Sequence, residues 1–499
     1  MKKKIVIPCV LMISLFIKIS AQQVNGVVIS DTSNIKVVKV WGNHYERGFA
    51  YGYLCSEEIY TVFHNYILPN YGTLLPIAKA LIGNPGNFTI DSIYITEGKA
   101  MVDGLAAAGV DTTDISYLDL FAINFMTDLQ GFYSFKGGVQ NCSSLMNWGE
   151  ATMGTDLNGK SVIAHHLDAT SLASVITANQ VVIIHIPSEI DEQAWMLTGT
   201  AGQMSASQAL NIKGLTAFLN TVEGFSAEGG KGYEPVTLAI RKGLEQKDYN
   251  NDGFDNVNDI RDALSSNTNG YASGFIICTL APSTAVEDSL IAMVAELTPE
   301  LPYTTFRYNN YPDSIDGDNL YAANDMVKRN DAQIYCSRYL NVSQEINNTY
   351  SGLNIGSDEN WDIMKSKSIQ STNLQFIQVI PEECVFKMAV SHNAHPAYQF
   401  APQEFNFCNL FFPNNVPQLT ADLKNIRLFP NPASDIIYIE AKNSADKYKV
   451  EIYNMLNQMI WSNEIEKKSG INISDFPKGI YLAKISSEKN SQLIKFVKQ

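Results

Sequence analysis

The chain has 499 residues, of which 45% are hydrophobic and 17% are charged. This length predicts two to four domains, and the composition excludes a largely disordered chain. The formal net charge is −15 and no long basic run is present, which disfavours nucleic acid as a partner.

The first residues have the layout of a secretory signal peptide. Three lysines precede an apolar stretch that ends in Ile19-Ser20-Ala21. We expect residues 1–21 to be this peptide, with cleavage after Ala21. The apolar run is short and interrupted, and no later segment is long enough to cross a bilayer. The sequence therefore predicts an exported protein without a transmembrane segment.

Export permits disulfides, and six cysteines follow the predicted signal peptide. They are far apart and form no CxxC pair, so three disulfides are formally possible but no framework is indicated: Cys55, Cys142, Cys278, Cys336, Cys384 and Cys408. Several lie in apolar runs that are typical of strands. Buried free thiols are the favoured interpretation for each.

The first part of the chain combines strand and helix signals. Residues 35–42 predict a strand, and residues 56–72 and 90–109 carry helical periodicity. From Cys142 onward, short strands rich in Val, Ile, Thr and aromatic residues dominate, for example at 180–187 and 274–281. Two helical segments interrupt them, at 234–247 and from residue 258. This order predicts an α+β fold in layers rather than alternating parallel units.

The C-terminal region changes texture again. Residues 413–423 predict a linker, and residues 424–499 predict a small all-β sandwich with frequent lysines. The segments LFPNPASDIIYIE, VEIYNMLNQMI and INISDFPKGIYLAKIS, followed by a short basic end, resemble the type A sorting domain of the type IX secretion system. This resemblance implies the type IX machinery as a partner, passage across the outer membrane, and release or surface anchoring.

A twelve-residue acidic loop lies between the two helical segments. In DYNNDGFDNVND, Gly253 occupies position six, where an EF-hand loop turns sharply. Side-chain oxygens, and one backbone carbonyl at position seven, occupy the calcium-binding positions of that loop: Asp248, Asn250, Asp252, Phe254, Asn256 and Asp259. Aspartate at position twelve resembles the dockerin-type loop. We expect a structural calcium ion here; a hydrated acidic loop is the alternative.

Cys142, in GGVQNCSSLMNW, is the strongest candidate for a nucleophile. A thiol nucleophile ordinarily needs a histidine as base, but none of the seven histidines has a papain-like or caspase-like context. His392 and His395 could form part of a metal site, but no third ligand is visible, so a loop role is favoured. Cleavage of the bond after Asn141 would instead supply the α-amino group of Cys142 as the base, since its reference pKa is near 8.

Seven segments, in order, resemble the N-terminal-nucleophile hydrolases of the isopenicillin-N acyltransferase group, relatives of penicillin V acylase and bile salt hydrolase. They are GNHYERGFAYG, EGKAMVDGLAAAGV, NCSSL, SVIAHHLD, LNIKGLTAFLN, AANDMV and CSRYL. The resemblance implies a four-layer αββα sandwich, with residues 22–141 as the pro-segment or α-chain region and residues 142–412 as the catalytic core. It also implies autocleavage between Asn141 and Cys142.

The resemblance implies a role for each matched residue. Cys142 would be the processing group and the acyl-accepting nucleophile, and Asp168 would orient its freed amine. Asn324, with Asn220 or a backbone amide, would donate hydrogen bonds to the oxyanion. Arg338 would lower the pKa of the thiol.

Three positions depart from the family pattern or allow a simpler interpretation. His165 stands where many relatives have arginine, and Asp325 stands where a histidine is usual. Asn211 is better explained by a turn before Gly214.

These features predict an exported, self-processing amidase that attacks a small acyl-amide substrate through a Cys142 thioester, with no cofactor for catalysis. Hydrolysis is favoured over acyl transfer because acyl-CoA is not at hand outside the cell. Two alternatives remain: a phospholipase B-like hydrolase of lipid esters, and a non-catalytic secreted calcium-binding surface protein.

Overall fold

The computed structural model describes residues 23–132, 141–169, 171–283, 290–312, 315–330, 336–411, 426–441, 447–454, 459–466, 470–486 and 491–498. The predicted signal peptide and the predicted linker lie outside the described residues. Within these ranges, no helix combines the length and the apolar character that a membrane span requires.

Two large sheets form the centre of the main domain. The nine-stranded sheet has the order β1 (Gly26–Thr32), β2 (Ile35–Gly42), β5 (Gln180–Pro187), β6 (Trp195–Thr200), β7 (Gln208–Asn211), β8 (Thr216–Val222), β9 (Gly274–Leu280), β10 (Ala292–Leu297), β11 (Thr304–Arg307). The six-stranded sheet has the order β12 (Asn319–Ala322), β3 (Ser143–Asn147), β4 (Val162–Asp168), β13 (Asn373–Ile380), β14 (Val385–Val390), β15 (Gln403–Asn406). Neighbouring strands are antiparallel except for β2 and β5, which are parallel.

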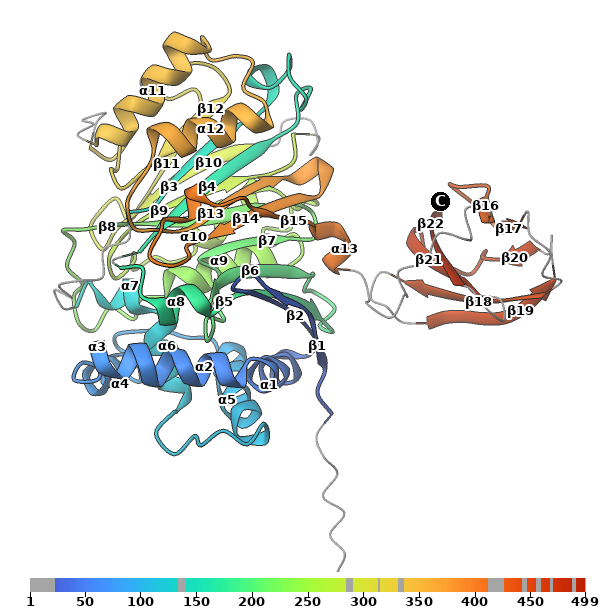
Figure 1. Ribbon diagram of the computed structural model, residues 1–499, viewed down its shortest axis with the longest axis horizontal. Helices are drawn as coiled ribbons and strands as arrows, with labels where there is room; N and C mark the ends of the chain where they lie inside the picture. Colours follow the sequence, from blue (N-terminus) through green and yellow to red (C-terminus); the bar gives the residue numbers. More distant parts are fainter. Residues whose placement is uncertain are drawn as a thin grey trace, which may run out of the picture.

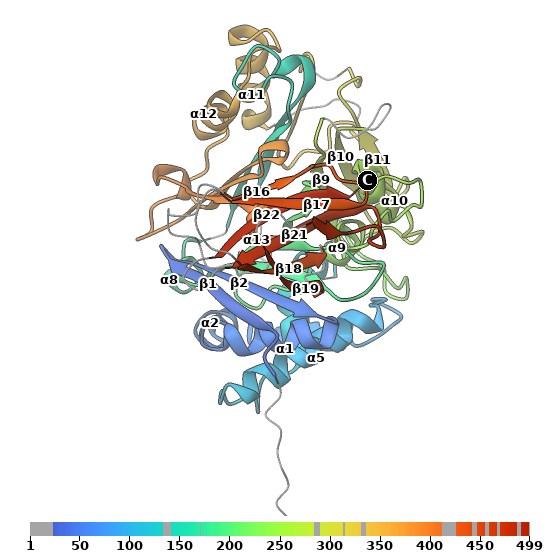
Figure 2. The ribbon, with the colours of Figure 1, turned by 90° about the vertical axis from the view of Figure 1, so that its right-hand side faces the viewer.

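Helices cover the outer face of each sheet (Figures 1 and 2). The nine-stranded sheet packs against α1 (His44–Leu54), α2 (Ser56–Val62), the π-helical η1 (Phe63–Ile67), α3 (Leu68–Tyr71), α4 (Leu75–Ile82), α5 (Ser92–Ala107), α6 (Tyr117–Asn124), α7 (Met126–Leu129), α8 (Ser174–Ala178), α9 (Val236–Glu245) and α10 (Val257–Ser265). The six-stranded sheet packs against α11 (Ser337–Thr349) and α12 (Ser357–Lys367). Short helical segments complete the domain: η2 (Gly149–Ala151), η3 (Pro381–Glu383), η4 (Ala397–Gln399) and α13 (Phe407–Phe411).

Strand β4 shows why the layers form. All seven of its residues are buried. Because successive side chains point to opposite faces, Ile163 and His165 point toward the nine-stranded sheet, whereas Ala164 and His166 point toward the outer helices. Separate apolar clusters fill the space between the sheets and the two outer spaces. The expected αββα sandwich is therefore confirmed.

The segment before Cys142 is an integral part of this domain. Strand β2 pairs with β5, and α1 packs closely along α5. A Cβ atom added at Gly52 would lie 2.0 Å from the carbonyl oxygen of Met101, and one added at Gly48 would lie 2.4 Å from that of Glu97. The glycines of GNHYERGFAYG therefore allow two helix backbones to approach each other.

The C-terminal region is a separate all-β unit, as expected. It consists of a three-stranded sheet in the order β16 (Ile426–Phe429), β17 (Ile436–Ala441), β20 (Gly470–Asn472), and a four-stranded sheet in the order β19 (Met459–Glu466), β18 (Lys447–Asn454), β21 (Gly479–Ser486), β22 (Ser491–Lys498). Among the described residues, its apolar core consists of side chains between Leu428 and Phe496.

The interpretation of the cysteines as buried free thiols is wrong for one pair. Cys384, immediately before β14, and Cys408, in α13, form a disulfide. Their 24-residue separation and apolar surroundings gave no sign of this pairing in the sequence, because two elements of different type bring them together. Cys55, Cys142 and Cys278 are free and buried, and Cys336 is free and partly buried.

Candidate active site

Cys142 immediately precedes β3, which lies between β12 and β4 in the six-stranded sheet. Strand β3 pairs with β4 so that Ser143 is opposite His166, which places Cys142 beside the last residues of β4. The backbone N–H of Asn141 donates a hydrogen bond to the carbonyl oxygen of Asp168 at 3.2 Å. The Cys142 side chain is fully buried. The pairing of two adjacent strands therefore brings Asp168 to the predicted nucleophile.

Arg338, the second residue of α11, connects the predicted site residues. Its Nη1 donates to the carbonyl oxygen of Asn141 at 2.6 Å and to that of Cys142 at 3.3 Å. Its Nη2 donates to Oδ1 of Asn324 at 2.5 Å, and its Nη1 lies 3.6 Å from Oδ2 of Asp168. One nearly buried guanidinium thus contacts the predicted scissile carbonyl, the amide of Asn324 and the carboxylate of Asp168.

Asp168 is held by a residue that the sequence interpretation missed. Asn373, at the start of β13, is paired with Asp168 in the sheet, and its Nδ2 donates to Oδ1 of Asp168 at 2.9 Å. Asn373 gives no signal in the sequence, because its role depends on the register between β4 and β13. Oδ2 of Asp168 accepts no hydrogen bond from the described part of the chain. This oxygen is available to a donor that appears later, such as a freed amine.

Burial controls the ionisation of this site. It raises the pKa of Asp168 from its ordinary value of 3.8 to about 7, although Asn373 and Arg338 oppose the rise. Burial, aided by the nearby charge of Asp168, also raises the pKa of the Cys142 thiol to about 12. Arg338 lowers that pKa, as expected, but its effect is outweighed. In the uncut chain, Cys142 is therefore a neutral thiol.

Asn220 and Asn324 form a bridge between the two sheets. Asn220, in β8, donates from Nδ2 to the carbonyl oxygens of Ala323 at 2.9 Å and Ala322 at 3.3 Å. Asn324 donates from Nδ2 to the carbonyl oxygen of Thr221 at 2.6 Å. Asn324 also contacts Arg338 directly, whereas the bonds of Asn220 are to the backbone beside it. Asn324 therefore belongs to the Arg338 network, whereas Asn220 is connected to it through the backbone of Ala322 and Ala323.

His165 and His166 fill the sheet faces as neutral rings. His165 contacts Oγ of Ser144 through Nδ1 at 2.9 Å and stacks on Phe218, with ring centroids 4.6 Å apart. Burial lowers the pKa of both histidines to about 3. His165 therefore brings no cation to the position where many relatives have arginine.

Two loop interpretations agree with the structure. Oδ1 of Asn211 accepts hydrogen bonds from the N–H groups of Lys213 and Leu215, which closes the expected turn. His392 and His395 exchange backbone hydrogen bonds, and Nδ2 of Asn34 donates to Nδ1 of His392 at 2.9 Å.

The predicted calcium loop connects α9 to α10. Gly253 has a φ of +94°, and its N–H donates to Oδ2 of Asp248 at 2.9 Å. Asn256 caps α10 and forms a capping box with Asp259, whose pKa burial raises to about 6. Oδ1 of Asp248 is buried and has no partner within the described residues. The turn and this free oxygen fit a hard cation, and the ligand set stays a prediction.

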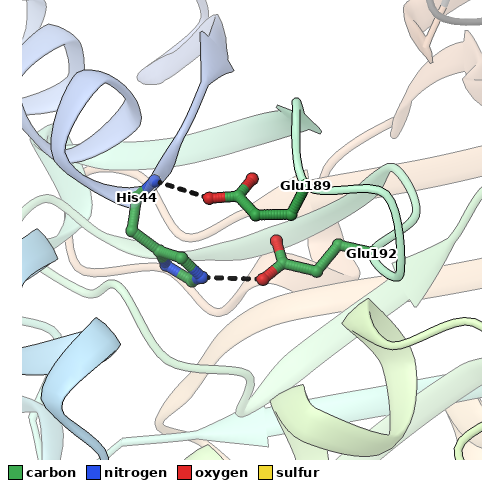
Figure 3. A group of neighbouring side chains, drawn as sticks. All are labelled: His44, Glu189 and Glu192. Atoms are coloured by element: carbon green, nitrogen blue, oxygen red, sulfur yellow. Dashed lines mark hydrogen bonds and ion pairs between the residues drawn. The ribbon is translucent and has the colours of Figure 1, made fainter.

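A second group of ionisable side chains was not predicted. His44, Glu189 and Glu192 form the one metal-compatible cluster of His, Cys, Asp and Glu among the described residues (Figure 3). Nε2 of His44 lies 2.8 Å from Glu192, and its Nδ1 lies 2.7 Å from Glu97. Although burial opposes it, these two carboxylates raise the pKa of His44 to about 9. A protonated imidazole has no lone pair for a metal, so the cluster is better described as an ion network.

Three further residues complete this buried ion network. Nη2 of Arg47 lies 2.9 Å from Glu192 and 3.0 Å from Glu245. Arg241 pairs with Glu97 at 2.6 Å and with Glu245 at 2.7 Å. His44, Arg47 and Glu97 lie in two segments that carry the family resemblance, but their partners lie far away in the sequence and could not be identified from it.

A cavity of about 130 Å³ lies close to the candidate site, although none of Cys142, Asp168 and Arg338 lines it. Part of its wall consists of chain neighbours of the site residues: Leu167 and Ala169 flank Asp168, Leu219 precedes Asn220, and Leu374 follows Asn373. Other lining residues come from α2, η1, α3, α6, α7 and α8, from β6 and β7, and from the start of α9. The cavity lies between the segment before Cys142 and the segment after it.

Three solved structures are similar to this chain. An N-acylethanolamine-hydrolyzing acid amidase ortholog from Caenorhabditis elegans is 12% identical, with a TM-score of 0.35, over 53% of this chain and 100% of that chain. A mutant of conjugated bile acid hydrolase from Clostridium perfringens is 13% identical, with a TM-score of 0.31, over 52% of this chain and 92% of that chain. Penicillin V acylase from Agrobacterium tumefaciens is 12% identical, with a TM-score of 0.33, over 53% of this chain and 85% of that chain.

No curated protein matches the chain by sequence. Residues 427–499 match the family described as "Secretion system C-terminal sorting domain". This match agrees with the all-β unit of β16 to β22. The chain therefore carries a C-terminal sorting domain that directs it, through the type IX secretion system, to the cell surface or the medium.

Proposed function

We propose that the protein is an exported cysteine amidase that cuts itself between Asn141 and Cys142 and then uses Cys142 as its nucleophile. The observation that carries the proposal is the 2.6 Å hydrogen bond from Arg338 to the carbonyl oxygen of Asn141. A guanidinium at this position polarises the carbonyl and stabilises negative charge on its oxygen during attack. The thiol of the next residue, Cys142, is the nucleophile in this proposal.

The cut proceeds in two steps. The sulfur of Cys142 attacks the carbonyl carbon of Asn141, and the peptide nitrogen leaves as the α-amine of Cys142, which takes up a proton. Water then hydrolyses the thioester, which releases the carboxylate of Asn141 and restores the thiol. Arg338 stabilises the oxyanion in both steps through the Nη1 donor that contacts the Asn141 carbonyl, and Asn324, whose Oδ1 accepts from Nη2, holds the guanidinium in place.

The cut prepares the site for an external amide. The new α-amine, with an ordinary pKa near 8, removes the proton from the thiol, so the high thiol pKa of the uncut chain no longer limits reaction. Oδ2 of Asp168, which lacks a hydrogen bond in the described residues, accepts one from this amine. Departure of Asn141 frees the Nη1 donor of Arg338 for a substrate carbonyl.

The substrate follows from the same geometry. A site that holds the peptide carbonyl of Asn141 against Arg338 holds another linear amide in the same way. The cavity beside Asp168 takes the acyl group, and the amine leaves toward solvent. Water then resolves the acyl-enzyme, which makes the reaction a hydrolysis.

Mass measurement and N-terminal sequencing of purified protein test the proposal. We expect two fragments, the second beginning at Cys142, and a single uncut chain for Cys142→Ala. Folded wild-type protein that stays uncut at Asn141, with and without calcium, would contradict self-cleavage. Hydrolysis of the same amide by Cys142→Ala would contradict the role of the nucleophile.

A further inference from the structure

The size of the cavity beside Asp168 limits what can enter it. At about 130 Å³, it is slightly smaller than the engineered cavity of 150 Å³ that holds one benzene molecule. It therefore accommodates a group of about six carbon atoms. A long fatty acyl chain would extend beyond it.

Two hydroxyl groups distinguish this cavity from a purely apolar one. Thr127, in α7, and Thr237, in α9, both line it. Each Oγ1 atom is buried and has no hydrogen-bond partner in the described ranges, and Thr237 is only 2% exposed. A buried hydroxyl without a partner destabilises the folded chain, and valine would fill the same space without that penalty.

Threonines in helices usually avoid this penalty by bonding to a preceding carbonyl. In this chain, Oγ1 of Thr96 donates to the carbonyl oxygen of Ser92 at 2.9 Å, and that of Thr177 donates to Ser174 at 3.3 Å. Thr127 and Thr237 make no such bond. Their hydroxyls remain available to a molecule in the cavity.

The two threonines lie close together although one precedes the predicted cut and the other follows it. Asp128, next to Thr127, accepts a hydrogen bond through Oδ1 from the N–H of Val236, next to Thr237, at 3.1 Å. Several other polar side chains of the lining already have partners: Oε1 of Gln203 accepts from the N–H of Thr200, for example. Within the described residues, Thr127 and Thr237 carry the buried hydroxyls of the lining that have no partner.

We propose that Thr127 and Thr237 bind a carbonyl or hydroxyl oxygen on the acyl group of the substrate, so that the enzyme prefers oxo- or hydroxyacyl amides of about six carbons. This inference rests on the proposed function, because it assigns the acyl group to this cavity. Chain neighbours of Asp168 and Asn373 supply apolar wall, and the two threonines supply the polar contact for the acyl group.

The test compares hexanoyl amide with hexanoyl amides that carry an oxo or hydroxyl group at carbon 3, 4, 5 or 6. We expect kcat/KM for the best oxygenated amide to exceed that of hexanoyl amide about tenfold. In Thr127→Val/Thr237→Val, this ratio should fall toward one. Thr177→Val removes a buried threonine hydroxyl that already has a partner, and it should leave the ratio unchanged.

Two outcomes would overturn the proposal: a wild-type preference for the plain hexanoyl amide over every oxygenated one, or the same ratio in the double valine variant. Binding of the free acids to uncut Cys142→Ala gives a readout that needs no catalysis. Oxohexanoic or hydroxyhexanoic acid should bind about tenfold more tightly than hexanoate, and the valine substitutions should remove the difference. If no amide is hydrolysed but this binding difference holds, the proposed reaction fails and the assignment of the cavity stands.

Discussion

Arg241 and Glu97 form an ion pair of 2.6 Å between two fully buried side chains that lie on opposite sides of the predicted cut in the sequence. The six most buried members of the ion network divide in the same way. His44, Arg47 and Glu97 precede the cut and carry a charge of +1 when His44 is protonated, whereas Glu192, Arg241 and Glu245 follow it and carry −1. Separation of the two fragments would leave each with an unbalanced buried charge. The network should therefore hold the cut protein together.

Glu97→Gln tests this role, because it removes a buried partner of both Arg241 and His44. We expect a loss of about 3–5 kcal/mol in the free energy of unfolding, and release of the fragment before Cys142 at a lower urea concentration than in the cut wild type. Gel filtration of the cut protein in increasing urea measures the release. Insertion of a site for a sequence-specific protease after Asn141 in Cys142→Ala provides the cut if self-cleavage does not occur.

Glu296→Gln is the matched control. Glu296 and Arg307 are both buried, 4.0 Å apart, and both follow the cut. This variant should lower the stability of the whole domain without earlier release of the first fragment. Equal release from both variants would show that the ion network does not hold the fragments together.

The pKa of Asp168 predicts a dependence of stability on pH. Its carboxyl is raised from 3.8 to about 7 in the folded chain. Between these values the folded state binds more protons than the unfolded state, so stability falls as the pH rises, by up to about 1.4 kcal/mol per pH unit. Uncut Cys142→Ala/Asp168→Asn lacks this penalty. Its advantage over Cys142→Ala should grow from pH 4 to pH 7 and then level off.

Urea unfolding of both proteins at pH 4, 5.5, 7 and 8.5 measures this advantage. Asp156→Asn is a control whose effect on stability changes with pH in the opposite direction. Hydrogen bonds from Ser357 lower the pKa of Asp156, although burial opposes them, so the cost of this substitution should grow as the pH rises. A constant difference between Asp168→Asn and its parent across the pH range would contradict the raised pKa.

Calcium should stabilise the loop between α9 and α10. The free Oδ1 of Asp248 and the turn at Gly253 predict that chelation lowers the melting temperature and that added calcium restores it. Asp248→Asn should abolish this response, whereas Glu228→Gln, which alters an exposed acid elsewhere, should keep it. A calcium response that survives Asp248→Asn would show that the ion binds at another site.

The layers and most strands could be predicted because they depend on local patterns. Short apolar runs bounded by Gly, Pro, Asn or Ser mark β5 and β9, and the helical period marks α5. The disulfide between Cys384 and Cys408 could not be predicted, since it depends on how β14 and α13 meet.

The candidate site also divides into residues that a local sequence pattern marks and residues that only the fold brings together. Cys142, Asp168 and Arg338 could be predicted as one group because each lies in a recognisable segment, and the structure brings them together. Asn373 and the partners of His44 could not be named, because strand register and helix packing bring them into place. The role of Asn220 stays a prediction: its segment was recognised, but the direction of its amide, toward Ala322 and Ala323, is fixed by the opposite sheet.

Arg338→Lys examines the contact on which the proposed reaction depends. Arginine reaches the carbonyl of Asn141 with Nη1 and Asn324 with Nη2 at the same time, and a single ammonium group cannot reproduce this fork. Loss of one oxyanion donor lowers the rate of an acyl-transfer step by about 10²–10³. We therefore expect self-cleavage of Arg338→Lys to slow by this factor while the chain stays folded.

The appearance of the fragment that begins at Cys142, followed by mass over time, gives the rate. Arg261→Lys, which changes a partly exposed arginine paired with Asp262, should cleave at the wild-type rate. If Arg338→Lys cleaves as fast as Arg261→Lys, the guanidinium only supports the fold, and the polarising group at Asn141 must be sought elsewhere.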